Sequence, residues 1–200
     1  HVRSRRQRQM CIRDSPYAAS VIEVSLDDEA TAEIRSTAHA LSTSPFAVFV
    51  AAYSLALAAV SDQHDFVVGA PVAGRNDEYE IGVPTLMLNM IAIRTRIDVE
   101  KKISDTVRSM ISNVTEAVSF GDSVFSKVVS EFADHTNEDP LFSTMVNMLT
   151  YPSLEFWDGD RSLHLTELNT GFTKYDASLY IQRHGEDYTC LLYTSPSPRD

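Results

Sequence analysis

The stretch that decides the fold is SPFAVFVAAYSLALAAVSDQHDFVVGAPVAGR, residues 44–75, where a long apolar segment is followed by a short one. Ser44 and Pro45 are a typical helix start, because a serine side chain caps the first turn and proline is tolerated at the first helical position. Phe46 to Val60 is therefore predicted to be a buried helix. Phe66 to Gly69 is predicted to be an apolar strand followed by a loop. A helix that leads into a buried strand indicates an α/β fold.

Helices and strands alternate on both sides of this stretch. The predicted ranges are 20–24 (strand), 27–41 (helix), 89–97 (strand), 101–120 and from 123 onward (helices), and 142–150, 163–168 and 175–182 (strands). Strands and helices alternate first, and strands dominate later. We therefore expect a two-layer α/β sandwich in which helices pack on a mixed sheet. No repeat or low-complexity linker divides residues 16–189, which are predicted to form one domain or part of one.

The composition excludes several classes of function. The 200 residues are 44% hydrophobic and 22% charged, as in an ordinary globular chain, and they carry a formal net charge of −11. Nucleic acid is not an expected partner, because phosphate binding needs clustered basic side chains. No apolar run approaches the ~18 residues that span a bilayer, so no membrane association is predicted. Two cysteines cannot form a disulfide framework, and a cytoplasmic location is predicted.

Both ends of the chain differ from the rest. Residues 1–15 are basic and lack apolar periodicity, and residues 190–200 end in a Ser/Pro-rich string. Both resemble sequencing-adapter text translated into protein, although a basic arm and a polar tail would have similar compositions. We predict that they are non-native and pack against nothing. Without them, residues 16–189 keep 11 basic and 26 acidic side chains, a formal charge of −15, and no cysteine.

Three short motifs suggest chemistry, but each lacks the residues that the chemistry needs. Residues 120–124 (FGDSV) resemble the start of a GDSL-type esterase, yet Ser123 lies between two predicted helices and no Asp-x-x-His follows. Residues 69–76 have P-loop glycine spacing without the Lys-Ser/Thr pair. His135 and Asp139 have the spacing of a base and an orienting carboxylate, but they lie in a polar loop. The other histidines lack metal-ligand spacing, so no metal site is predicted.

Read as a whole, residues 16–189 resemble the C-terminal half of a condensation domain from a nonribosomal peptide synthetase. Five segments match family motifs in order. They are SPFAVFVAAY (44–53), QHDFVVGAPVAGR (63–75), GVPTLMLNMIAIR (82–94), DPLF (139–142) and TGFTKYD (170–176). A sixth motif, at residues 120–125, is degraded. Each match alone is weak, but five in the right order and spacing form a strong signal.

The resemblance implies one lobe of a chloramphenicol-acetyltransferase-like domain with two lobes. A tunnel between the lobes would admit phosphopantetheine arms from upstream and downstream carrier domains, and an adenylation domain would be a further partner. The complete domain would join a carrier-bound acyl or peptidyl thioester to the amine of a carrier-bound aminoacyl group. The family's His-His-x-x-x-Asp-Gly motif belongs to the N-terminal lobe and does not occur in this sequence. We therefore expect an inactive fragment, the acceptor-side lobe, with no directly bound cofactor.

The resemblance also assigns roles to individual residues. Asn89 matches the motif asparagine that faces the tunnel, although an asparagine at a strand start also caps turns. Arg94 is the motif arginine, and a salt bridge is favoured over catalysis because Arg96 lies on the same side of the strand. The remaining predicted sites are the tunnel floor loop, residues 69–80, with Gly69, Pro71, Gly74 and Arg75, and a latch toward the other lobe with Tyr151, Phe156, Trp157, Thr170 and Gly171.

Two classes of function stay open at this point. The first is the amide-forming enzyme lobe. The second is a non-catalytic docking or scaffold domain on the same fold, whose other lobe lacks the histidine. Epimerisation and cyclisation relatives share the fold and are further alternatives within the enzyme class.

Overall fold

The structure is a computed structural model that describes residues 19–74, 83, 87–132, 141–149, 155–158, 161–164 and 173–195. The chain folds into two compact units. The helical unit comprises residues 28–147, and the strand unit comprises residues 1–27 and 148–200.

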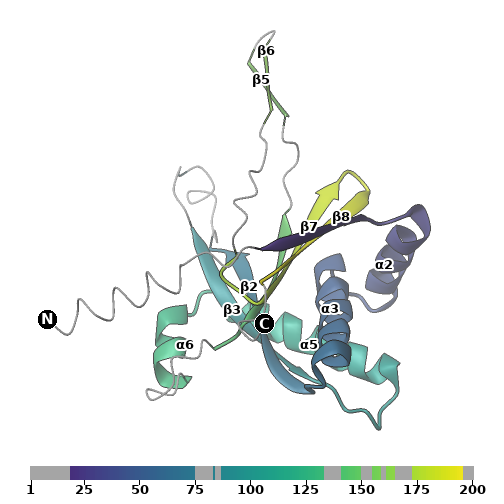
Figure 1. Cartoon of the computed structure of the whole chain (residues 1–200), viewed down its shortest axis with the longest axis vertical. Helices are drawn as coiled ribbons and strands as arrows, with labels where there is room; N and C mark the ends of the chain where they lie inside the picture. Colours follow the sequence, from purple (N-terminus) through teal and green to yellow (C-terminus); the bar gives the residue numbers. More distant parts are fainter. Residues whose placement is uncertain are drawn as a thin grey trace, which may run out of the picture. The chain divides into compact units, whose positions relative to one another are not determined.

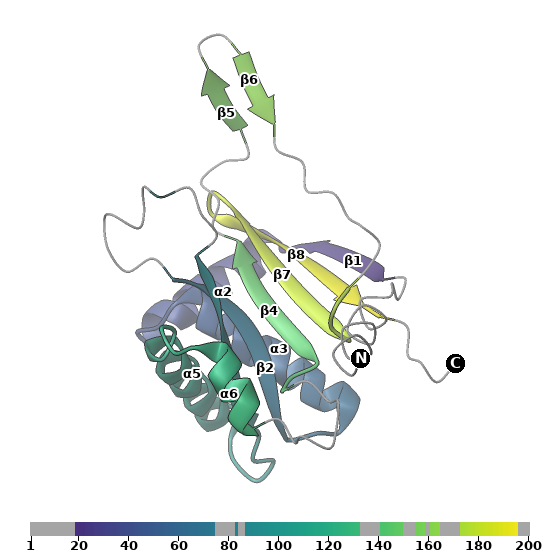
Figure 2. The ribbon, with the colours of Figure 1, turned by 90° about the vertical axis from the view of Figure 1, so that its left-hand side faces the viewer.

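The helical unit contains the stretch on which the fold prediction rests. Its elements are α2 (Asp28–Ala40), α3 (Pro45–Ser61), β2 (Asp65–Ala73), β3 (Leu88–Arg96), α5 (Ile103–Ser119), α6 (Phe125–Phe132) and most of β4 (Thr144–Leu149). The strand β2 is antiparallel to β3 and parallel to β4, so the sheet of this unit is mixed. Figure 1 shows β2 and β3 side by side, and Figure 2 shows α2, α3 and α5 behind β2 and β4. The predicted fold class, helices packed on a mixed sheet, is confirmed.

Helix α3 begins and ends where local chemistry dictates. The Ser44 hydroxyl accepts a hydrogen bond from the Ala47 N–H at 3.3 Å, and Pro45 occupies the first turn. Asp62 ends the helix in a left-handed conformation, with its N–H bonded to the Ala58 carbonyl. No single helix in the described ranges has the length and apolar composition to cross a membrane, although α2 and α3, bent by 110°, pass that test as a pair.

Apolar side chains and two hydroxyl pairs hold α3 to the sheet. The Tyr53 hydroxyl lies 2.7 Å from the Thr144 hydroxyl of β4, and the Ser54 and Thr95 hydroxyls are 3.3 Å apart. All four of these side chains are buried, so each hydroxyl needs a partner inside the protein. The apolar core around them includes Ala47, Val50, Val68, Ile93, Val114 and Val146.

The second strand is longer than predicted. Residues 70–73 continue β2 and pair with β3 up to Ala73 opposite Leu88, whereas the sequence prediction ended the strand at Gly69. Pro71 lies within this extension, opposite Met90. The prediction stopped early because glycine and proline are typical loop residues, yet proline is tolerated in a strand where its missing N–H is not needed by a neighbour.

The strand unit contains an antiparallel set of three strands and a hairpin. The strands β1 (Ser20–Ser25) and β7 (Ala177–His184) both pair with β8 (Asp187–Thr194). The hairpin joins β5 (Glu155–Asp158) to β6 (Arg161–His164). Figure 2 shows β7 and β8 side by side.

The prediction that residues 190–200 pack against nothing is wrong for residues 190–194. These residues form most of β8, where Leu192 lies opposite Ile22 on one side and Leu179 on the other. The rings of Tyr180 and Tyr193 meet edge to face at 5.3 Å. A ladder uses backbone groups, so a β-prone string with aliphatic and aromatic residues can complete it. The non-native origin of this segment stays a prediction, and residues 1–15 and 196–200 lie outside the described ranges.

Candidate functional site

Most of the predicted tunnel residues lie on two neighbouring strands. Gly69 and Pro71 are in β2 and Gly74 directly follows it, while Asn89 and Arg94 are in β3. The Gly74 N–H donates to the Met87 carbonyl at 2.9 Å, so residues 69–74 of the predicted floor loop belong to the strand pairing or directly follow it. Of the other predicted residues, Arg75, Tyr151, Thr170 and Gly171 lie outside the described residues, and Phe156 and Trp157 are backbone positions of β5.

Gly69 is required by a close approach of an aromatic ring. A Cβ atom at this position would overlap the ring of Phe142, which is itself only 7% exposed. Phe142 lies two residues before the start of β4, and β4 pairs with β2 at Val68 and Gly69. The glycine of the predicted P-loop-like motif therefore makes room for a side chain, which supports the structural interpretation of that motif.

Phe142 also connects β2 to α6. Its ring centroid lies 5.8 Å from that of Phe125, the first residue of α6, with the two planes tilted by 47°. Such tilted pairs are favourable beyond the apolar area that they bury. The helix was predicted from residue 123 but begins at Phe125, so Val124 lies just before it and is 54% exposed.

The side-chain amide of Asn89 donates hydrogen bonds to the turn between α5 and α6. Its Nδ2 donates to the Gly121 carbonyl and to the Ser123 carbonyl, each at 2.6 Å. Both amide hydrogens are therefore engaged by backbone groups of the protein. Of the two interpretations weighed for this asparagine, the geometry favours turn capping. Its carboxamide oxygen has no hydrogen bond among those described.

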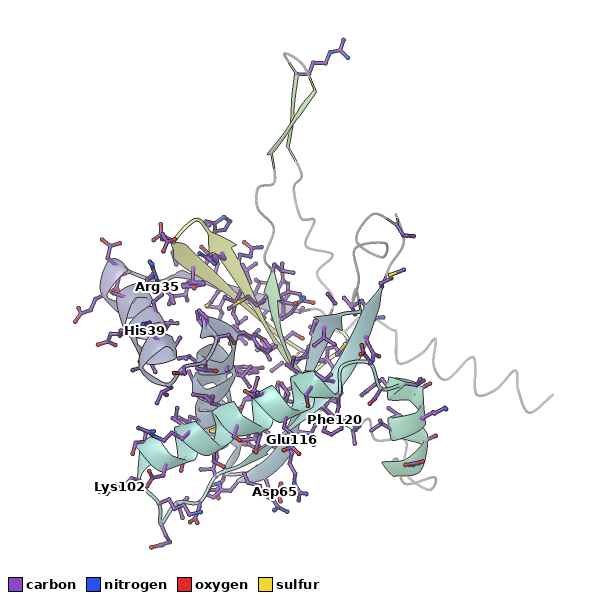
Figure 3. The ribbon with its side chains drawn as sticks, turned by 180° about the vertical axis from the view of Figure 1, so that it is seen from behind. Arg35, His39, Asp65, Lys102, Glu116 and Phe120 are labelled. Atoms are coloured by element: carbon purple, nitrogen blue, oxygen red, sulfur yellow. The ribbon has the colours of Figure 1, made fainter. Side chains whose placement is uncertain are left out.

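Arg94 is held by a carboxylate at the other end of the ladder. Its Nε and Nη2 reach the two oxygens of Asp65 at 2.9 and 2.8 Å, and the Arg96 Nε reaches the same carboxylate at 3.2 Å. Hydrogen bonding from Arg94, aided by Arg96, lowers the pKa of Asp65 from 3.8 to about 2. The expected salt bridge at Arg94 is present. Asp65, the first residue of β2, is labelled in Figure 3.

The described residues show no assembled reaction centre. Ser123 is exposed in the turn between α5 and α6, where its carbonyl accepts from Asn89. Within the ranges that the structure describes, no group of three or more His, Cys, Asp or Glu side chains is placed to hold a metal ion. His135 lies outside those ranges. The described contacts bring segments of several family motifs together, since residues 69, 89, 121 and 142 belong to one packed region.

Sequence reasoning missed the partners within this region. Phe142 was quoted as part of a motif, but nothing local shows that its ring would lie over Gly69. The same holds for Asp65, whose spacing from Arg94 spans two strands. The only signal in the sequence for these contacts was that the segments belong to motifs of one family, in the family's order.

The comparisons with known proteins agree with the fold. A family model described as "Condensation domain" matches residues 8–195. A plipastatin synthase protein of Bacillus subtilis (strain 168) is 28% identical over 176 residues, which is 87% of this chain and 5% of that protein. Surfactin synthase subunit 2 of the same organism is 27% identical over 175 residues, 86% of this chain and 5% of that protein.

Two solved structures show the same architecture. The condensation domain of the Monacolin K polyketide synthase MokA has a TM-score of 0.74 at 17% identity, over 90% of this chain and 42% of that one. The four-domain nonribosomal peptide synthetase AB3403 has a TM-score of 0.78 at 14% identity, over 90% of this chain and 15% of that one. The chain thus spans a small part of the synthetases and about two fifths of a solved condensation domain. Because the family model covers most of its length, the chain belongs to the condensation-domain family.

Proposed function

We propose that the chain is the acceptor-side lobe of an amide-forming condensation domain in a nonribosomal peptide synthetase. In the reaction, the amine of a carrier-bound aminoacyl group attacks a carrier-bound acyl or peptidyl thioester. The new bond is C–N and the C–S bond breaks, while a general base takes a proton from the amine and passes it to the thiolate that leaves on the upstream carrier. The observation that carries this proposal is the family match over residues 8–195.

The site residues take roles that depend on this proposal. The segment from Gly69 to Gly74 forms part of the tunnel floor, and Arg94 with its Asp65 partner braces the sheet beside it. Asn89 lies along the tunnel wall with its amide turned to the α5–α6 turn. The carboxamide oxygen is the atom left to face the tunnel, since both amide hydrogens are engaged.

The hairpin of β5 and β6 is proposed as the latch. It carries Phe156 and Trp157, and the paired positions run from Glu155 opposite His164 to Asp158 opposite Arg161. An isolated two-stranded hairpin is only marginally stable in water. Packing against the N-terminal lobe would supply the stabilisation that the hairpin lacks by itself, and aromatic side chains suit such an interface.

The partners follow from the same chemistry. The thioesters reach the site on phosphopantetheine arms of upstream and downstream carrier domains, so the lobe itself needs no bound cofactor. An adenylation domain supplies the activated amino acid, and the setting is cytoplasmic. The lobe by itself lacks the His-His-x-x-x-Asp-Gly general base and is inactive.

A scaffold role is the second candidate. The observation that favours it is that both amide hydrogens of Asn89 are bonded to backbone carbonyls, so this side chain has no amide hydrogen left for a reacting group. The coding sequence upstream of residue 16 distinguishes the two. A His-His-x-x-x-Asp-Gly motif there selects the enzyme, and its absence selects the scaffold.

The direct experiment is an amide-formation assay with both carriers loaded. The complete domain, expressed within its synthetase module, is compared with the 200-residue chain alone, and the product is detected by mass spectrometry. We expect product from the complete domain only. A complete domain without product, although its carriers are loaded and it is folded, would exclude the enzyme.

A further inference from the structure

We propose that Asn89 is a positioning residue whose side-chain amide fixes the α5–α6 turn and, through that turn, the placement of α6. The amide orientation is unambiguous, because both partners are carbonyl oxygens that can only accept. The two bonds, each 2.6 Å from Nδ2, reach Gly121 and Ser123, which are two residues apart in the turn. A single side chain therefore ties both carbonyls to the start of β3.

The turn is also held by its own backbone and by a neighbouring strand. The Gly121 N–H donates to Val118 and the Ser123 N–H donates to Phe120, each at 2.9 Å. A Cβ at Gly121 would lie 3.3 Å from a methyl carbon of Val72, which is directly opposite Asn89 in the β2–β3 ladder. The cross-strand partners Asn89 and Val72 thus both hold this turn, Asn89 by hydrogen bonds and Val72 by close packing.

The placement of α6 depends on this turn. The helix has eight residues, which is too short for stability by helix propensity. Its first residue, Phe125, packs on Phe142, and Phe142 fills the space above Gly69. Figure 3 shows α5 running from Lys102 to Phe120, with α6 beyond its Phe120 end. Asn89 therefore acts on Gly69 through the turn and two aromatic rings. That Gly69 borders a substrate tunnel rests on the proposed function, whereas the contacts themselves do not.

The test is amide hydrogen exchange, followed by mass spectrometry, on the 200-residue chain. Asn89→Asp keeps the shape of the side chain but replaces two donors with a carboxylate that faces two carbonyls. We expect amides of residues 121–132 to exchange at least about tenfold faster than in the parent chain, with α3 unchanged. Asn113→Asp is the matched control, because Asn113 donates to the Arg94 carbonyl from the middle of α5, and it should leave residues 121–132 unchanged.

A second variant, Asn89→Ala, distinguishes the loss of the two hydrogen bonds from the repulsion that a carboxylate adds. In Asn89→Ala, water can reach the two freed carbonyls, so the increase in exchange should be smaller than in Asn89→Asp. Equal effects, or unchanged exchange in both variants, would overturn the proposal. If Asn89→Asp unfolds the whole chain, the alanine variant alone must still show faster exchange confined to residues 121–132, and global or absent changes would refute the positioning role.

The complete domain separates this proposal from the proposed function. Its rate of amide formation should fall in the order parent, Asn89→Ala, Asn89→Asp, while the KM for the loaded carriers stays within about twofold. If the parent domain forms no amide, the proposed function fails, but the exchange experiment still decides the role of Asn89.

Discussion

The middle of the β2–β3 ladder and its Asp65 end are held by opposite kinds of interaction. Beside Gly69, the neutral ring of Phe142 makes the close contact, and Phe142 is 7% exposed. At Asp65, one carboxylate holds two arginines in solvent, with exposed side-chain fractions of 48%, 59% and 64% for Asp65, Arg94 and Arg96. Burial therefore decides how much each contact contributes to the free energy of unfolding, because exposed ion pairs are screened by solvent and contribute little.

Removing the buried ring beside Gly69 should have the largest effect. Phe142→Ala leaves a cavity between β2 and α6, and deletions of this kind cost about 3–5 kcal/mol of unfolding free energy. Chemical denaturation of the chain measures the loss. Gly69→Ala in the Phe142→Ala background should then be close to neutral, because the ring that the new methyl would strike is gone. An additive double variant would break the assignment of these two residues to one contact.

Adding a methyl group at Gly69 should have the next largest effect. Gly69→Ala forces the Phe142 ring to move, and overpacking of a buried site costs about 1–3 kcal/mol. Gly74→Ala is the matched control, because its Cβ would find the nearest atom, the Met87 oxygen, at an ordinary 3.7 Å. Similar melting temperatures for the two variants would show that Gly69 is not confined by the ring.

Loss of the buried hydrogen bond between Tyr53 and Thr144 should have the third largest effect on stability. Tyr53→Phe removes a hydroxyl 2.7 Å from the Thr144 hydroxyl and leaves the latter buried, which costs about 1–2 kcal/mol. Desolvation by burial raises the pKa of Tyr53, so the hydroxyl is neutral near pH 7. The double variant Tyr53→Phe with Thr144→Val should recover part of the loss. A loss no larger than that of Asp65→Asn would contradict the ranking by burial.

The ionic end should show the smallest effect and the clearest pH dependence. Asp65 has its pKa lowered from 3.8 to about 2 by Arg94 and Arg96. A lowered folded-state pKa means that the contribution is complete above about pH 4 and is lost as the pH falls toward 2. The stability difference between the parent chain and Asp65→Asn should therefore shrink over that range and also shrink at high salt. A difference that is unaffected by pH and salt would exclude the ion pair as its source.

Local signals explain which features could be predicted from the sequence. Ser44 and Pro45 define the start of α3 because capping is a property of adjacent residues, and the alternation in β3 placed Arg94 and Arg96 on one side. The contact of Gly69 with Phe142 joins residues far apart in the chain, and the partners of Asn89 lie 32 and 34 residues away. Residues 190–194 were misjudged for a related reason, since pairing with β1 is not visible in the strand itself. The family resemblance located the motif segments but not the contacts between them.

The measurement that tests the central claim most directly is amide formation from two loaded carriers. The chain alone, the complete domain and the complete domain with its general-base histidine replaced by alanine are assayed at equal folded concentration. The account predicts product from the unaltered complete domain and none from the chain alone, with a loss of roughly 10²–10⁴-fold in the histidine variant. Product formed by the 200-residue chain without the rest of the domain would contradict it.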